Sequence, residues 1–191
     1  MDKSALISKL SLKYGFILAS VSVVVSLTMY FINPVMVYTS FAAQIGIFIL
    51  FIALLVFAGI TIRKEIGGFW TFGEAFKSFL IIALILAITA TLYNVLLMKF
   101  IDPDLPQKAA SAIEDAQRTM MEKFGMASEQ IDEAIAKAGN MEEKLQPSFK
   151  NIFTSFGVSL ALYGVLSLIL AAILKKNEPV TFNTFPTEEV Q

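Results

Sequence analysis

Four long uncharged apolar runs dominate the pattern of hydrophobic and polar positions along the chain. They cover residues 14–32, 41–62, 78–98 and 152–174, and none contains Asp, Glu, Lys or Arg. A bilayer core about 30 Å thick needs roughly 20 apolar residues in a helix. Because hydrocarbon offers no hydrogen-bond partner to a free backbone, each run must be helical. The pattern predicts an all-α fold, a bundle of four transmembrane helices within residues 1–176.

The segment between the third and fourth runs, residues 99–151, has the pattern of short amphipathic helices. Apolar side chains recur on one helical face over residues 109–124 and again over residues 131–138. Gly125 and Gly139 follow these stretches and predict the two helix ends. The segment is therefore expected to be a helical insertion on one side of the membrane.

Capping residues refine this prediction. Ser128 is expected to cap the second amphipathic helix. Asn140, with Glu143 three residues later, predicts a short third turn. Two interpretations remain open for the insertion: a hairpin resting on the membrane surface or span ends, or a cap that binds a partner.

Composition supports the membrane interpretation and narrows the chemistry. The 191 residues are 56% hydrophobic and 16% charged, with a mean hydropathy of +0.69 and a formal net charge of −1. These values are typical of membrane proteins and give no indication of nucleic-acid binding. The chain has no Cys and no His, which removes thiol chemistry and the commonest general base and metal ligand. Asp102 and Asp104 alone are too few oxygens for a calcium site, so no metal or cofactor is expected.

The distribution of cations predicts an orientation. Cytoplasmic loops of membrane proteins carry an excess of Lys and Arg. The loop after the first run has no charge, whereas cations flank the other side of the runs: Lys3, Lys9, Lys13, Arg63, Lys64, Lys77, Lys175 and Lys176. Both termini are therefore expected in the cytoplasm, the insertion outside, and residues 177–191 as a disordered cytoplasmic tail. A cleaved signal peptide ending at Ala42 is an alternative, but its apolar region would exceed the usual range of roughly 7–15 residues.

The stretch RKEIGGFWTFGEAFKSF, residues 63–79, is predicted to be a helix–helix corner on the inner face. Its glycine spacing matches neither a dinucleotide fingerprint nor a phosphate-binding loop. Arg63 and Lys64 suit the last turn of the second span, where cations favour the helix dipole. Gly67, followed by Gly68, is placed to end that helix in a left-handed conformation.

The second half of this corner carries a helix-start signal. Thr71 and Glu74 match the S/T-x-x-E capping box, so the third helix should begin near Thr71 or Phe72 rather than at Ser78. Trp70 is expected at the headgroup level, and Lys77 can extend to the surface. One helix flank should carry Phe69, Phe72, Phe76 and Phe79.

Three amides lie near the predicted outer ends of the spans. They are Asn33, Gln44 and Asn94, and each needs a hydrogen-bond partner in a lipid environment. We expect them to share a polar cluster at the outer mouth of the bundle.

The fourth run contains both a polar group and small residues. Tyr163 lies at its middle, and its hydroxyl is expected to turn inward toward a partner among Ser22, Ser26 and Thr89. Gly157 and Gly164 belong to a small-residue pattern that allows close helix approach. Packing within the bundle is the favoured interpretation, and oligomerisation is the alternative.

Three motifs connect the chain with a known family. LKYGFILA at residues 12–19, RKEIGGFWTFGEAF at residues 63–76 and IDPDLP at residues 101–106 resemble the bacterial membrane family called domain of unknown function 4199, typical of Bacteroidetes. The resemblance covers roughly residues 10–176; Ala19 stands where we expect a second glycine. It implies four spans and a location in the inner membrane, and it supplies no activity or catalytic residue.

The leading functional hypothesis is a non-enzymatic structural, accessory or envelope-response component of the membrane. It would contact lipid and act through protein–protein contacts, with a homo-oligomer or another membrane protein as partner. The alternative is an oligomeric permease or channel for a small solute. A lipid-modifying enzyme fits least well, because only Glu65 and Glu74 near two cations could serve it.

Overall fold

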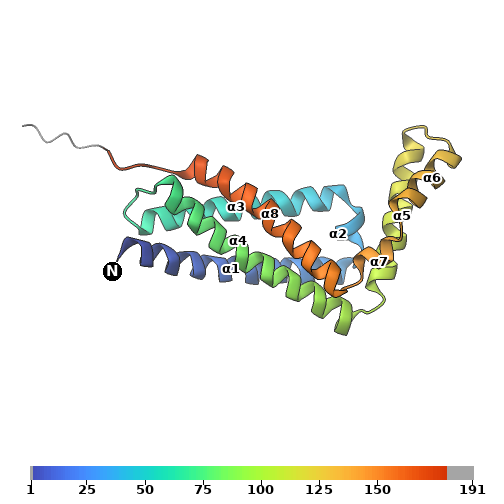
Figure 1. The fold of residues 1–191 in the computed structure, drawn as a ribbon, viewed down its shortest axis with the longest axis horizontal. Coiled ribbons are helices and arrows are strands. Elements are labelled where there is room, and N and C mark those ends of the chain that lie inside the picture. Colours follow the sequence, from blue (N-terminus) through green and yellow to red (C-terminus); the bar gives the residue numbers. More distant parts are fainter. Residues whose placement is uncertain (1, 180–191) are drawn as a thin grey trace, which may run out of the picture.

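The computed structural model describes residues 2–179, and helices make up nearly all of this range (Figure 1). Four long helices lie alongside one another: α1 (Lys3–Ile32), α3 (Phe41–Glu65), α4 (Phe72–Leu96) and α8 (Phe149–Leu174). All four are long and apolar enough to cross a membrane, α4 together with its continuation to Ile101. The prediction of an all-α bundle with four membrane helices is thereby confirmed. The predicted disordered tail falls mostly on residues 180–191, outside the described range.

Shorter helices connect the long ones. Helix α2 (Met36–Thr39) joins α1 to α3, and the π-helix η1 (Leu97–Ile101) continues α4. The predicted insertion contains α5 (Leu105–Lys123), α6 (Ser128–Ala138) and α7 (Met141–Leu145), which we call the projecting segment. Figure 1 shows this segment standing away from the bundle, at the end opposite the N-terminus.

The ends of the projecting helices follow the sequence signals, with one exception. Gly125 and Gly139 have φ of +78° and +73°, the left-handed conformation that favours glycine, and both follow helix ends as predicted. Asn140 caps α7 by accepting from the Glu143 amide at 3.1 Å, also as predicted. The cap assigned to Ser128 is wrong. Ala127 is the N-cap residue, and Ser128 is already the first residue of α6.

Two of the long helices begin earlier than the uncharged runs. Helix α1 starts at Lys3, because Ile7, Leu10 and Ser11 are buried against the rest of the bundle. Helix α8 starts at Phe149, where the Ser148 hydroxyl accepts from the Asn151 amide at 3.2 Å. A search for uncharged runs therefore finds the membrane-crossing part of a helix but not the turns that extend beyond it.

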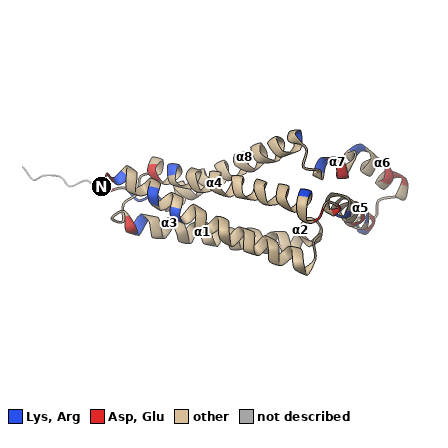
Figure 2. Cartoon of the chain, turned by 90° about the horizontal axis from the view of Figure 1, so that it is seen from below, with Lys and Arg blue, Asp and Glu red and all other residues tan. Residues whose placement is uncertain are grey.

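The core surrounds α4, which packs extensively against both α1 and α8. Phe79, Ile82 and Ala87 on this helix are almost completely buried. Charged side chains gather at the two ends of the bundle and leave the middle of the long helices uncharged (Figure 2). The molecule therefore combines a band of apolar surface with two polar ends, as a membrane-spanning protein requires.

Glycines mark where the helices come closest together. A Cβ placed on Gly59 would lie 2.7 Å from Phe79 Cζ and 2.8 Å from Leu174 Cδ1, and one on Gly15 would lie 2.5 Å from Ile85 Cδ1. By contrast, a Cβ on Gly157 or Gly164 would meet nothing within 4 Å. The close packing predicted for Gly157 and Gly164 within the bundle is therefore not found, and Gly15 and Gly59 take that role.

Candidate functional site

The corner between α3 and α4 contains the motif that the sequence singled out. Gly67 and Gly68 have φ of +100° and +88°. The Gly68 amide donates to the Arg63 carbonyl at 2.9 Å, and the Gly67 amide donates to the Lys64 carbonyl at 3.2 Å. This pair of hydrogen bonds is the Schellman arrangement, which satisfies the last carbonyls of a helix. The prediction that Gly67 ends the second span is confirmed.

The capping box at the start of α4 is also confirmed. The Glu74 amide donates to Thr71 Oγ1 at 3.3 Å, and the Thr71 amide donates to Glu74 Oε2 at 2.8 Å. The helix begins at Phe72, as predicted. Thr71 and Glu74 therefore have a structural task at this corner, since they satisfy amides that the first turn would leave free.

The corner is joined to the end of α8 by contacts that the sequence did not reveal. Trp70 and Lys176 exchange backbone hydrogen bonds of 2.7 Å in both directions, forming an isolated antiparallel bridge. Arg63 donates from a guanidinium nitrogen to the Leu174 carbonyl at 3.1 Å. Trp70 is completely buried, with its ring centroid 5.6 Å from that of Phe79. Trp70 is therefore enclosed by the bundle, which the sequence did not reveal, and its expected level at the headgroups stays a prediction.

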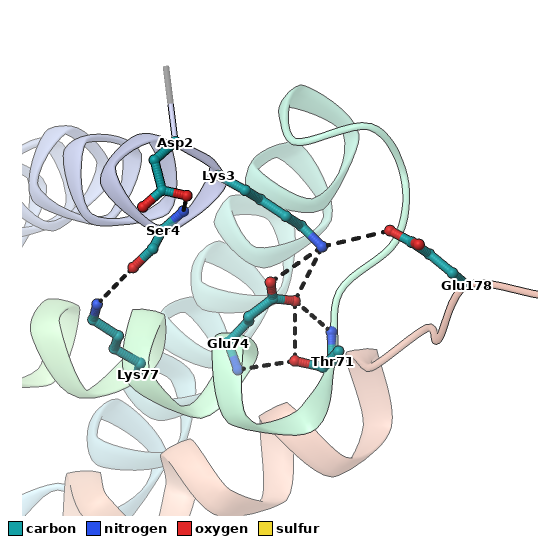
Figure 3. Close-up of polar contacts among 7 residues, drawn as sticks. All are labelled: Asp2, Lys3, Ser4, Thr71, Glu74, Lys77 and Glu178. Carbon is teal, nitrogen blue, oxygen red and sulfur yellow. Dashed lines mark hydrogen bonds and ion pairs between the residues drawn. The ribbon is translucent and has the colours of Figure 1, made fainter.

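Polar side chains connect the corner with the start of α1 (Figure 3). Lys3 Nζ lies 3.1 Å from Glu74 Oε1 and 3.8 Å from Glu178 Oε1. Lys77 donates to Ser4 Oγ at 3.2 Å. Each group is already engaged by a neighbour from another element. The corner is therefore arranged as a clasp between helices, and its titratable groups do not converge on a hollow.

A buried serine pair lies one turn deeper. Ser11 and Ser78 are both fully buried, and their Oγ atoms are 2.5 Å apart. Ser11 also donates to the Ile7 carbonyl at 2.7 Å. The pair links α1 to α4 and gives the buried Ser78 hydroxyl a partner on the neighbouring helix.

The other half of the bundle is hollow. A cavity of about 420 Å³ lies between α1, α2, α3, α4 and α8, and Leu97 of η1 and Leu105 of α5 complete its wall. Its apolar wall reaches inward as far as Leu55 and Leu86. None of its lining residues is Asp, Glu, Lys or Arg; the polar ones are Ser22, Ser26, Tyr30, Tyr38, Gln44, Tyr93, Asn94 and Tyr163. The volume is within the range of about 300–1,000 Å³ that is usual for small-molecule sites.

The structure brings two of the three predicted amides to this cavity. Gln44 and Asn94 both line it, whereas Asn33 does not. Asn33 instead accepts from the Val35 amide at 3.0 Å in the loop after α1. Gln44 donates to the Val37 carbonyl at 3.1 Å, and Asn94 donates to the Ala90 carbonyl at 2.9 Å. The amides therefore satisfy nearby backbone rather than one another.

Tyrosines add the remaining polar groups. Tyr163 lines the cavity together with Ser22 and Ser26, but within residues 2–179 its hydroxyl forms no hydrogen bond with any of its three predicted partners, and Ser22 donates to the Ala19 carbonyl instead. The hydroxyl of Tyr93 is buried and has no hydrogen-bond partner among the described residues. Burial raises the pKa of Tyr38, and nearby Tyr93 adds to the effect. Sequence reasoning missed Tyr38 and Tyr93, because their convergence depends on α2 folding back over the end of α4.

Asp102 has a structural role next to this cavity. Lys108 Nζ lies 2.9 Å from Asp102 Oδ1, a hydrogen bond that raises the pKa of Lys108. The Tyr30 hydroxyl donates to Asp102 Oδ2 at 3.3 Å. Over residues 2–179 no group of three or more His, Cys, Asp or Glu side chains could hold a metal ion. Asp102 therefore fastens α5 to the end of α1.

Comparisons with known proteins give one match. Residues 13–176 match the model of a family described as "Protein of unknown function (DUF4199)". No curated protein and no solved structure matches the chain.

Proposed function

Because the chain belongs to the DUF4199 family, whose description names no activity, we propose a function from the geometry: a non-enzymatic, multi-pass membrane protein that acts through protein–protein contacts of its projecting segment. The observation that carries this proposal is the apolar tip of that segment. Met120, Phe124 and Met126 surround the turn at Gly125, and the exposed fraction of the Phe124 side chain is 76%. Exposed aromatic and methionine side chains that project together are typical of interaction sites.

The projecting segment holds this tip away from the four-helix bundle (Figure 1). Helix α5 packs against both α6 and α7, and Arg118 Nη2 on α5 lies 2.8 Å from Asp132 Oδ1 on α6. Ala109 and Ala110 at the other end of α5 are buried against the rest of the molecule. The base is therefore fixed while the tip is free to meet a partner, either a second copy of the chain or another membrane protein.

The proposed location is the inner membrane of a bacterium, with the corner and both termini in the cytoplasm. The support is the charge distribution: the cations at the corner end lie beside the polar clasp, and the loop containing α2 has no charge. The projecting segment would then face the periplasm. We propose no catalytic role for Glu65 or Glu74, because Glu65 accepts from the Tyr14 hydroxyl at 2.8 Å and Glu74 completes a capping box.

The alternative, an oligomeric permease or channel, is less well supported. A path through one chain would have to cross the corner half of the bundle, where Phe79, Ile82, Ala87 and Ile62 are buried and packed. The cavity ends at this packed layer.

Site-specific photo-crosslinking in native membranes tests the proposal. A benzoylphenylalanine is introduced at Phe124, and a matched control at Phe57, whose side chain is similarly exposed on α3. We expect discrete protein adducts at Phe124 and none at Phe57, and we expect the same partners to be lost from pull-downs when residues 107–146 are deleted. Identical adducts at both positions, or a partner set unchanged by the deletion, would contradict a contact role for the projecting segment.

A further inference from the structure

The cavity in the hollow half of the bundle has the features of a binding site. It is lined by side chains from seven helices, η1 and α5 included, and its polar atoms are all uncharged. Transferring an ion into such a site without a counter-charge is very costly, so an anionic or cationic group would be excluded. The lining therefore selects for a neutral ligand.

Unused hydrogen-bonding groups line this cavity. The buried Tyr93 hydroxyl has no partner within residues 2–179. Gln44 and Asn94 each use their NH₂ group on backbone carbonyls, which leaves their amide oxygens as acceptors. A buried polar group without a partner is costly and calls for an additional molecule to satisfy it. The site therefore offers a donor and acceptors to one small polar group.

The rest of the cavity is apolar and opens sideways. Helices α3 and α8 are in close contact at Gly59 and Leu174 and diverge toward the other end (Figure 1). There, a Cβ added to Gly46 or to Gly157 would meet nothing within 4 Å. Phe48 on α3 lines the cavity with 59% of its side chain exposed. In a bilayer this gap faces hydrocarbon, so a ligand can enter from the lipid phase.

We propose that the cavity binds a neutral lipid with one aliphatic chain and a hydroxyl-bearing head group. The head group hydrogen-bonds with Tyr93 and the free amide oxygens of Gln44 and Asn94. The chain lies along the apolar wall toward Leu55 and Leu86. This binding is independent of the partner contacts proposed for the projecting segment.

Photo-labelling in proteoliposomes tests the site directly. The probe is a monoacylglycerol that carries a diazirine and an alkyne in its chain. We expect saturable labelling on peptides that contain Leu55 or Leu86, and competition by unlabelled monoacylglycerol but not by the same chain ending in phosphate. Labelling that does not saturate, or equal competition by the phosphate compound, would overturn the proposal.

Variants separate binding from folding. Ala90→Phe fills the cavity and should reduce saturable labelling at least tenfold, while Val158→Phe on the exposed face of α8 should leave it unchanged. The emission of Trp70, the only tryptophan, reports folding from the opposite end of the bundle. If that emission shows Ala90→Phe to be misfolded, Ser26→Leu fills the same space and replaces it. A folded cavity-filling variant that keeps full labelling would refute the site.

A third variant tests the head-group contact. Tyr93→Phe removes the unpartnered hydroxyl and keeps the ring. If this hydroxyl binds the ligand, the variant should bind the probe several-fold more weakly and lose no stability. Unchanged labelling affinity would contradict this contact.

Discussion

Single small residues determine how closely the helices approach one another at the corner end. Gly59 admits the ring of Phe79 and the side chain of Leu174, both of which are buried. Gly157 lies on the same kind of membrane helix but faces open space. Without a hydrophobic driving force between helices in lipid, such close approach is a main source of stability. The two glycines therefore form a matched pair for testing the packing.

Gly59→Ala should destabilise the bundle by about 1–3 kcal/mol, since the added methyl group would overlap buried atoms that cannot easily move. Gly157→Ala should be neutral or slightly stabilising, because alanine is the better helix former and space is free around it. Unfolding with increasing SDS in mixed micelles measures both. Equal free energies of unfolding for the two variants would show that the close approach at Gly59 contributes nothing.

The Ser11–Ser78 pair makes a second prediction at the scale of residues. Ser11→Ala leaves the buried Ser78 hydroxyl without this partner, Ser78→Ala leaves Ser11 bonded only to the Ile7 carbonyl, and the double variant removes both hydroxyls. We therefore expect non-additive losses, with a coupling of about 0.6–2 kcal/mol, the range for hydrogen bonds between membrane helices. The exposed Ser20, which bonds only to its own helix, serves as the control. Strictly additive losses would mean that the two hydroxyls do not support each other.

At the scale of elements, the corner is a clasp that joins four helices, α1, α3, α4 and α8. Its local parts are the Schellman motif at Gly67 and the capping box at Thr71. Its long-range part is the backbone bridge between Trp70 and Lys176, which ties the end of α8 to the corner. Beside this bridge, Trp70 is completely buried, although it lies in the short connection between α3 and α4.

Lys176→Pro tests this bridge, because proline has no amide to donate to the Trp70 carbonyl. Lys175, which precedes it, is already extended and tolerates a following proline. We expect a loss of about 0.5–1.5 kcal/mol, a red shift of the Trp70 emission and stronger quenching by acrylamide. Asn177→Pro, one residue beyond the bridge, is the control. Unchanged quenching of Trp70 in Lys176→Pro would show that the bridge does not hold the indole in place.

The corner was predictable where its signals are local, and the cavity was not. A glycine that ends a helix and a capping box act within a few residues, so Gly67, Thr71 and Glu74 could be assigned from the sequence. The environment of Trp70 depends on the backbone of Lys176, far along the chain, and no short motif records that contact. The cavity arises from the divergence of α3 and α8, which the sequence pattern does not encode.

At the scale of the whole molecule, the two ends of the bundle have opposite characters. The corner end is packed and fastened by polar contacts, and the other end holds the cavity and supports the projecting segment. This polarity is the basis of both proposals. In these proposals the clasp lies in the cytoplasm and fixes the helices, while the opposite end offers one site for lipid and one tip for a protein partner.

The membrane topology is the central claim, and the absence of cysteine makes it directly measurable. Single cysteines are introduced at Met126, on the tip, and at Gly73, where a side chain meets open space in the first turn of α4. Spheroplasts that carry either variant are treated with a membrane-impermeant maleimide, once intact and once after permeabilisation. The account predicts that Met126→Cys reacts in intact spheroplasts and that Gly73→Cys reacts only after permeabilisation. Reaction of Gly73→Cys from outside, or protection of Met126→Cys until permeabilisation, would contradict it.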